Sequence, residues 1–349
     1  MSEIAPQDTA PRAWDRVVVR PLQKDEVTNQ NGPDIIRLIE PKDNAGSPEL
    51  LHELLSQGHD TLEALIAEHG AVVFRGFGVD PASFRSAVLR AYNASRYIWM
   101  MPMPPKLAQF FLSLPLIGWF LNWLLGRIEA WATGRTLTQK DTSTLAYEDN
   151  IQFPHHEFGI FFNIPRVIAF YCEKQSNTGG ETLFCDAERA WNALDPDLKS
   201  RFETAKFIRY KNENQILPPP FTAPALLNHP KSGVPSLNLT GYHHRIVAEE
   251  GQRLFPEARI ELGDYDENFM FKPTVVDSKG SPVELNEADY RAIIAAHLAE
   301  GVLLPWKEGD VMFCDNYKVV HGRINGGTPR KVLQVMLCDY QPNDTRFFA

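Results

Sequence analysis

From residue 151 onward the chain is a succession of strand-length apolar segments separated by turns, and no other sequence feature limits the fold as strongly. Turn sequences such as Asn-Thr-Gly-Gly at 177–180 and Asn-Gly-Gly-Thr-Pro at 325–329 separate the segments. We expect strands within 159–165, 166–173, 181–186, 207–213, 309–315, 318–324 and 331–340. Helices are expected within 186–194, 195–202 and 286–301. The pattern predicts an α+β protein with two facing sheets or a barrel, and with helices packed outside.

The N-terminal part reads differently, because it contains helices with clear start and stop signals. Ser47-Pro48 and Asp60 each precede an apolar-periodic run that ends at a glycine, and Asp80-Pro81 begins a third helix. A buried strand is predicted at 71–77. Residues 1–35 are expected to form an irregular arm. No internal repeat is present, and we interpret residues 1–349 as one domain.

Charge and cysteine content exclude some classes of protein. The net charge is −9 without a basic block, so no nucleic-acid-binding surface is expected. The four cysteines have no Cys-x-x-Cys spacing, which indicates buried reduced thiols. The N-terminal residues lack the pattern of a secretory signal. A cytoplasmic location is the expectation, with a position peripheral to a membrane as the alternative.

The segment 107–125 interrupts this pattern, because it is apolar and carries no charged residue. Its length reaches that of a membrane span. Pro115 and Gly118 argue against one straight helix, so we expect helices broken near 115–118, beside the mouth of the site. The surrounding residues 97–135 are interpreted as an apolar insertion. A lid over the substrate, a homodimer face, a membrane-surface contact and a span all remain open.

A cluster of possible metal ligands lies in the sequence Pro-His-His-Glu-Phe-Gly. In a strand, His155 and Glu157 point to the same face and His156 points to the other. This pattern alone also fits an ordinary polar strand end. His321 follows on a later apolar strand, and two histidines with one carboxylate form the facial triad of non-haem Fe(II) oxygenases. Such a triad leaves coordination positions open for a chelating oxo-acid and oxygen.

Two further residues could hold the distant carboxylate of the oxo-acid. Arg330 lies nine positions after His321 (330 − 321), and its planar fork can bind a carboxylate through two hydrogen bonds. Thr182 could donate a hydroxyl hydrogen bond to the same group. Viewed singly, each could equally be an ordinary turn or strand residue.

The order of these motifs resembles the TauD/TfdA family of Fe(II)/2-oxoglutarate-dependent dioxygenases. His-x-Glu is followed by Gly-Gly-Glu-Thr, then by Trp306, Gly309-Asp310, Asp315-Asn316 and His321-Gly-Arg, and finally by Arg330. The match is most similar to the branch related to syringomycin-biosynthesis hydroxylases, whose middle motif is similar to residues 226–244. The resemblance covers roughly 60–95 and 145–340.

The resemblance implies a clavaminate-synthase-like fold with a double-stranded β-helix, or jelly-roll, core. It implies iron at His155, Glu157 and His321, with 2-oxoglutarate held by Thr182 and Arg330. Many family members carry a second arginine where this chain has Gln334, and the insertion at 97–135 is longer and more apolar than expected.

The implied reaction is the oxidation, most simply the hydroxylation, of an unactivated C–H bond of a small molecule. The substrate could be amino-acid-like, carrier-bound or apolar, and desaturation or cyclisation remain open. The alternative is a non-catalytic or other-metal cupin-like binding protein associated with membranes through 107–125.

Other polar residues near these motifs receive weaker interpretations. His156 is expected to be a hydrogen-bonded core histidine. His243 or His244 could contact substrate. Arg323 shares the strand face of His321 and could bind a carboxylate.

Overall fold

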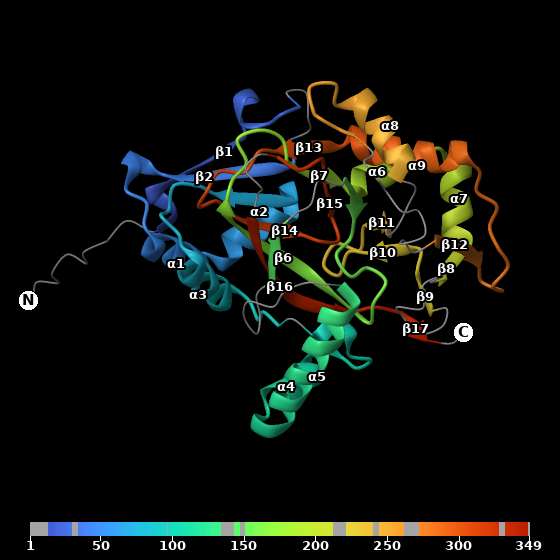
Figure 1. The fold of residues 1–349 in the computed structure, drawn as a ribbon, viewed down its shortest axis with the longest axis horizontal. Coiled ribbons are helices and arrows are strands. Elements are labelled where there is room, and N and C mark those ends of the chain that lie inside the picture. The colour runs from blue at the N-terminus through green and yellow to red at the C-terminus, as the bar shows by residue number, and fades with distance from the viewer. Residues whose placement is uncertain are drawn as a thin grey trace, which may run out of the picture.

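The protein is built around two β-sheets that face each other across a shared apolar core (Figure 1). The computed structural model describes residues 13–29, 34–95, 97–133, 143–146, 151–211, 221–239, 244–261, 272–327 and 332–347. The strands of the large sheet are, in spatial order, β1 (Val17–Pro21), β2 (Ile36–Pro41), β3 (Ala71–Phe74), β14 (Val311–Asp315), β6 (Asn163–Lys174), β16 (Val332–Pro342) and β4 (Ser143–Ala146). Neighbouring strands are antiparallel except β2 and β3, which are parallel.

The small sheet contains the order β13 (Gly301–Leu304), β7 (Thr182–Asp186), β15 (Val319–Arg323) and β5 (Gln152–His155), and all its pairs are antiparallel. Along the chain the strands pass repeatedly between the sheets: β4, β6, β14 and β16 lie in the large sheet, and β5, β7, β13 and β15 lie in the small one. Residues distant in sequence therefore become neighbours in the small sheet.

The long strand β6 shows how both faces of the large sheet are buried. Ile168 and Phe170 belong to the core between the sheets, together with Phe184 of β7 and Leu304 of β13. The alternate residues, such as Ala169, face the opposite side, because strand side chains alternate between faces. This explains why β6 reads as a continuous apolar run rather than an alternating one.

Helices cover the outer faces of both sheets (Figure 1). The large sheet is covered by α1 (Pro48–Gln57), α2 (His59–His69) and α3 (Pro81–Ala91). The small sheet is covered by α6 (Ala187–Ala193), α8 (His244–Leu254) and α9 (Glu287–Ala299), and α7 (Pro196–Thr204) extends the same apolar cluster. Two further sheets pack on this side, with the orders β12 (Lys272–Asp277), β8 (Ala205–Lys211), β9 (Phe221–Pro224), β17 (Arg346–Phe347), and β10 (Leu226–Asn228), β11 (Pro235–Leu237).

The helix-start signals in the sequence were reliable. Ser47 accepts a hydrogen bond from the Leu50 amide at the start of α1, and Asp80 forms a capping box with Ser83 at the start of α3. Helix α2 differs slightly, because its N-cap is Gly58 rather than the expected Asp60.

Two expectations about strands were wrong. The N-terminal arm is not irregular throughout, because β1 pairs with β2 along its whole length. The two strands expected at 159–165 and 166–173 are a single strand, β6, which begins only at Asn163 and is preceded by a turn. All four cysteines are buried, as expected.

The apolar segment forms two helices, α4 (Pro105–Ser113) and α5 (Pro115–Thr133), which project from the body of the molecule (Figure 1). The pair is bent by 109° between the two helices, which confirms the predicted break, and Pro115 begins the second helix. No single helix in the described ranges is long and apolar enough to cross a membrane, although this bent pair meets the criteria of length and composition together.

Asn163 attaches the root of this projection to the large sheet. Its side-chain amide donates to the carbonyl oxygens of Ile98 (2.9 Å), Met101 (2.9 Å) and Met103 (3.1 Å). These carbonyls belong to the short 3-10 helix Ile98–Met100 and to the residues that lead from it into α4, and Asn163 is only 1% exposed. The Ile98 and Met101 carbonyls also accept from the backbone amides of Met101 and Met103, so the buried Asn163 amide reinforces this turn and gives the Met103 carbonyl a donor.

We expect Asn163→Ala to lower the free energy of unfolding by about 2 kcal/mol, because three carbonyls at the root lose a side-chain donor. Asn163→Asp should be at least as destabilising, since a carboxylate would face the same three oxygens. Urea denaturation of both variants measures the effect. Stability equal to that of the wild type in both would show that these hydrogen bonds do not hold the root.

Candidate metal centre

Strands β5 and β15 bring two histidines of the predicted triad side by side. His155 and His321 are register partners in the small sheet, although they lie 166 positions apart in the chain (321 − 155). Their ring centroids are 4.6 Å apart. His321 is also in edge-to-face contact with Phe170 from the opposite sheet, at a centroid distance of 5.5 Å, so the ring lies in the core between the sheets.

Glu157 joins the two histidines from the turn that follows β5. Its Oε2 atom lies 3.4 Å from Nε2 of His155 and 3.5 Å from Nε2 of His321. The sequence argument placed His155 and Glu157 on one strand face. The structure brings them together as predicted, but β5 ends at His155. Phe158, which directly follows Glu157, adopts a left-handed backbone conformation with φ 57°.

The separation of these atoms suits a shared metal ion. One ligand atom from each of His155, Glu157 and His321 can be chosen so that all lie within 4.8 Å of one another. Two ligands at right angles on an ion with bonds of about 2.1 Å would lie roughly 3 Å apart, close to the observed spacings. Two imidazoles and one carboxylate form the donor set of non-haem Fe(II) oxygenases. The residues present therefore fit iron.

His156 points away from this cluster, as predicted. It is 1% exposed, its backbone amide donates to the Leu239 carbonyl, and its Nε2 atom lies 3.5 Å from the Ser236 hydroxyl. Burial lowers the pKa of His156 to about 3, so the ring is neutral. It is a core residue on the opposite side of the turn from the metal ligands.

Asn316 holds the backbone of Glu157 in place. Its Oδ1 accepts from the Glu157 amide at 2.8 Å, and its Nδ2 donates to the Glu157 carbonyl at 3.0 Å and to the Pro165 carbonyl at 2.9 Å. Asn316 is fully buried directly after β14. The candidate carboxylate ligand is therefore positioned by a side chain that follows a different strand.

Comparison with known proteins identifies this arrangement. Residues 39–337 match the family model described as "Taurine catabolism dioxygenase TauD, TfdA family". The chain belongs to the TauD/TfdA family. It is accordingly an iron- and 2-oxoglutarate-dependent dioxygenase, in agreement with the resemblance of its motifs and with the donor set of the cluster.

Two curated relatives of this TauD/TfdA protein are distant. A clavaminate synthase-like protein from Arabidopsis thaliana is 24% identical over 303 residues, covering 78% of this chain and 82% of the relative. A 3-((Z)-2-isocyanoethenyl)-1H-indole synthase from Fischerella ambigua is 25% identical over 219 residues, covering 57% of this chain and 67% of the relative.

Solved structures share the TauD-like fold. The PvcB protein from Pseudomonas aeruginosa superposes with a TM-score of 0.59 at 15% identity, covering 99% of this chain and 97% of that chain. Another structure of PvcB, described as an Fe, alpha-ketoglutarate dependent oxygenase from an isonitrile synthetic pathway, gives the same score with 99% and 98% coverage. A taurine dioxygenase-like protein from Burkholderia xenovorans gives 0.55 at 13% identity, with 95% and 99% coverage.

Thr182 lies on the same face of the small sheet as His321. It pairs with Arg323, and two residues further along β7 Phe184 pairs with His321. By strand geometry the Thr182 and His321 backbones are roughly 8 Å apart. The Thr182 hydroxyl oxygen accepts a hydrogen bond of 2.8 Å from the Trp306 indole. Trp306 is thus a partner of a candidate site residue, and the sequence motif contained it without indicating this contact.

Some of the other residues singled out in the sequence lie outside the described residues, and Gln334 has a structural contact. Arg330, His243 and the side chain of His244 lie outside the described residues. Gln334, which takes the place of a second arginine, is buried and donates to Glu173 Oε2 at 3.0 Å. It therefore has a structural partner on the neighbouring strand β6.

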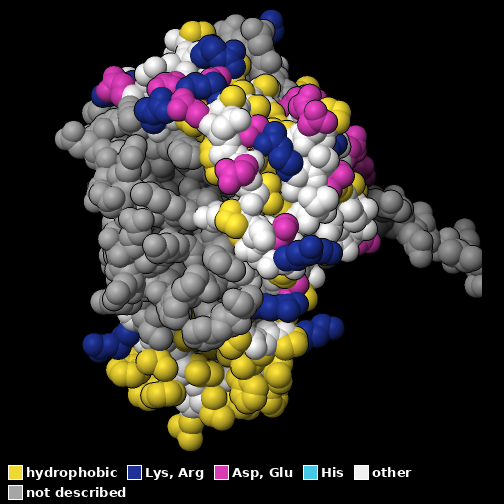
Figure 2. Space-filling model, turned by 90° about the vertical axis from the view of Figure 1, so that its right-hand side faces the viewer, with side chains coloured by type: hydrophobic (Ala, Val, Ile, Leu, Met, Phe, Trp, Pro, Cys, Tyr) yellow, Lys and Arg dark blue, Asp and Glu magenta, His cyan; other side chains and the backbone are white. Residues whose placement is uncertain are grey.

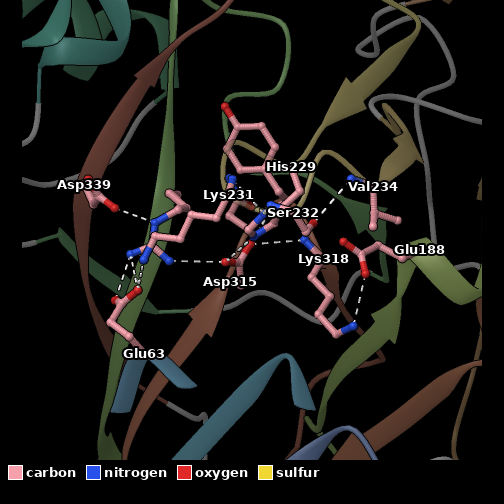
Figure 3. Close-up of polar contacts among 12 residues, drawn as sticks. Glu63, Glu188, His229, Lys231, Ser232, Val234, Asp315, Lys318 and Asp339 are labelled. Carbon is pink, nitrogen blue, oxygen red and sulfur yellow. Dashed lines mark hydrogen bonds and ion pairs between the residues drawn. The ribbon is translucent and has the colours of Figure 1, made fainter. Parts of the chain in front are cut away.

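A network of charges supports the residue before Asn316. Asp315 accepts hydrogen bonds from His229 Nε2 at 2.9 Å and from Arg166 Nη1 at 3.3 Å (Figure 3). Because His229 Nδ1 accepts from the backbone amides of Lys231 and Ser232, its proton is on Nε2. Arg166 also forms ion pairs with Glu63 of α2 and Asp339 of β16. The network joins β6, β14, β16 and α2 behind the turn that carries Glu157.

Asparagine side chains also hold the turn that follows Glu157. These asparagines were assigned no role from the sequence. Asn238 donates to the Gly159 carbonyl at 2.9 Å, and Asn343 donates to the carbonyls of Gly159 and Phe161 at the same distance. Their sequence signal was weak, because a buried asparagine and an exposed one look alike in a single sequence. Asn316 was visible only as part of the family motif.

We expect Asn316→Ala to weaken Fe(II) binding roughly 10- to 100-fold, because the Glu157 backbone loses its positioning hydrogen bonds. Anaerobic Fe(II) titration measures the affinity. Asn343→Ala is the matched control, since it removes an amide from the same turn without touching Glu157, and it should lower stability while keeping the iron affinity. Equal losses of affinity in both variants would assign Asn316 a general structural role.

A second expectation concerns pH. Burial alone would raise the pKa of Glu63, but hydrogen bonds from Arg166, Lys231 and Tyr92 outweigh it and lower the pKa from 4.5 to about 2. The stabilisation from the ionised carboxylate is complete above 4.5 and is lost as the pH falls towards 2. Glu63→Gln should therefore be less stable than the wild type by on the order of 2 kcal/mol near neutral pH, with a smaller difference at about pH 3. Urea denaturation at both values checks this, and a difference that does not depend on pH would contradict it.

Proposed function

We propose that His155, Glu157 and His321 hold Fe(II) and that Thr182 and Arg330 hold 2-oxoglutarate beside it. The observation that carries this proposal is the convergence of two imidazole nitrogens on one carboxylate oxygen in the core between the sheets. Glu157 Oε2 lies 3.4 Å from His155 Nε2 and 3.5 Å from His321 Nε2. When bound, iron with 2-oxoglutarate and O2 supplies the oxidation of an unactivated C–H bond.

The fold supports a jelly-roll assignment. Within the two sheets, the strands β4, β16, β6, β14 and β5, β15, β7, β13 lie in these orders, so successive strands cross between facing layers. We interpret these eight strands as a double-stranded β-helix. In this arrangement His155 and His321 lie on adjacent strands of one layer, and β6 of the other layer covers them.

The side chains near the cluster have separate roles in this proposal. Asn316 fixes the turn that presents Glu157. Trp306 donates to the oxygen of Thr182, so the hydroxyl proton can be directed to another acceptor, and the proposed acceptor is a carboxylate of 2-oxoglutarate. Arg330 precedes β16 and would supply a charge-assisted, two-bonded contact to the same carboxylate.

Hydroxylation of a small molecule is the outcome we favour, because Glu157 completes the facial triad. The substrate class stays open among amino-acid-like, carrier-bound and apolar molecules. Desaturation is a second candidate, since two similar proteins are named as an isocyanoethenyl-indole synthase and as an oxygenase of an isonitrile pathway. Mass spectrometry of products distinguishes the gain of one oxygen atom from the loss of two hydrogens.

A test of the metal site follows from the donor set. Anaerobic addition of Fe(II) and 2-oxoglutarate should give a weak visible charge-transfer band, because the oxo-acid chelates the bound ion. His155→Ala, Glu157→Ala and His321→Ala should each abolish the band and iron-dependent succinate formation. Arg330→Ala should keep iron binding and raise the 2-oxoglutarate concentration needed for the band, by more than Thr182→Val does.

The controls decide between an oxygenase and a non-catalytic binding protein. His156→Ala should retain iron, because its ring points to the opposite side of the turn. Full turnover in any one of the three ligand variants would remove that residue from the triad. A metal that binds without any effect of 2-oxoglutarate would favour the cupin-like alternative.

A further inference from the structure

The projecting helices α4 and α5 carry an unusual concentration of exposed apolar side chains. Of the ten large hydrophobic side chains that are exposed among the described residues, seven lie in this segment. They are Leu107, Phe110, Leu116, Ile117, Trp119, Phe120 and Trp123. Leu116 is 83% exposed and Trp119 is 69% exposed, both close to the bend. A contiguous patch of this kind marks a contact surface.

Figure 2 shows where the patch lies. Hydrophobic side chains cover the projection at the bottom of the view, and lysine or arginine side chains lie at its border. Between residues 97 and 128 the sequence contains no aspartate or glutamate, and the basic residues described there are Lys106 and Arg127. This local absence of negative charge contrasts with the net charge of −9 of the whole chain.

Two polar side chains within the tip donate hydrogen bonds to backbone carbonyls of their own helices. Asn122 donates to the Gly118 carbonyl at 2.6 Å, and the Ser113 hydroxyl donates to the Phe110 carbonyl at 2.7 Å. Gly118 permits the close approach of the two helices, because a Cβ at this position would lie 2.1 Å from the Leu112 carbonyl oxygen. These two hydrogen bonds lower the cost of moving Ser113 and Asn122 out of water.

We propose that the α4–α5 tip docks onto the surface of an anionic membrane. The apolar side chains would enter the boundary between headgroups and acyl chains, with Trp119 and Trp123 at the interface. Lys106 and Arg127 would meet the negative headgroups. Arg127 lies over the Trp123 ring at 5.4 Å, which brings a basic and an aromatic side chain to the same border.

Charge favours a membrane over a second copy of the chain. In a symmetric dimer through the exposed apolar residues 107–123, the basic residues of one copy would find no carboxylate among those residues of the other. A lid is disfavoured because the seven side chains are exposed on a part that projects from the body (Figure 1).

The root of the projection lies next to the metal motif. Trp99, which precedes α4, stacks on Phe158 with ring centroids 4.1 Å apart and an interplanar angle of 6°. Phe158 directly follows Glu157. A docked tip would therefore hold the metal centre in a defined position relative to the membrane.

Co-sedimentation with vesicles tests the proposal. The full chain, with and without Fe(II) and 2-oxoglutarate, is mixed with vesicles of phosphatidylcholine or of phosphatidylcholine and phosphatidylglycerol. Binding should be tighter to the anionic vesicles. Leu116→Ser/Trp119→Ser should reduce partitioning more than tenfold, because two apolar side chains no longer enter the interface. Lys106→Glu/Arg127→Glu should reduce binding to anionic vesicles about tenfold or more and have little effect on neutral ones.

A matched control removes exposed apolar side chains elsewhere. Val19 on β1 and Leu89 on α3 are 40% and 39% exposed, and Val19→Ser/Leu89→Ser should bind vesicles like the wild type. Circular dichroism confirms that each variant is folded. Because sedimentation is measured without turnover, its outcome is separate from the test of the metal site.

Several outcomes would overturn the proposal. The wild type could fail to sediment with either kind of vesicle, or Leu116→Ser/Trp119→Ser could sediment like the control. A change from dimer to monomer in light scattering, without vesicle binding, would assign the tip to an interface between copies. A loss of turnover without vesicle binding would assign it to a lid.

Discussion

The pairing of β5 with β15 is the constraint on which the metal centre depends. It sets His155 opposite His321, and a shift of register by one residue would turn one of the two rings to the other face of the sheet. The pairing is in turn enforced by burial, since Val320 and Leu183 face the outer helices while His321 faces Phe170. Hydrophobic patterning thus positions polar ligands in a core that would otherwise exclude them.

The third ligand depends on a different kind of support. Glu157 lies in a turn, where no sheet register fixes the backbone. Hydrogen bonds from asparagine side chains fix the backbone of residues 157–161 instead. They come from Asn316, Asn238 and Asn343. Behind them, the ion pairs of Arg166 connect α2 to β14 and β16. Asn316, Asn238 and Arg166 are buried with partners, so moving the turn would leave charges or amides without hydrogen bonds.

The α4–α5 projection differs from the rest of the structure, because its apolar side chains are exposed. The Asn163 amide at its root is buried. Asn163 and the stacked rings of Trp99 and Phe158 fix the root to the same turn that carries Glu157. Within the described residues, these contacts therefore connect the candidate metal centre to the exposed apolar surface of α4 and α5. This connection gives the proposed membrane contact a physical relation to the site.

The sequence by itself determined the local features. Ser47 and Asp80 begin helices where their side chains cap the backbone, Pro115 breaks the apolar segment, and the β-branched runs form strands, because these effects act within a few residues. The ordered motifs also led to the family and to the three candidate metal ligands. The β1 strand and the length of β6 were missed, because pairing with a distant strand decides both.

Only the tertiary structure decided what each local feature contacts. It placed Glu157 in a turn held by Asn316, gave Gln334 a partner in Glu173, and joined Trp306 to Thr182. It also showed that the apolar residues of 107–125 are largely exposed, whereas their composition was equally compatible with burial. The physical reason is common to all of these cases. Hydrogen bonds and burial depend on which segments meet in space, and in this fold the meeting segments lie far apart in the chain.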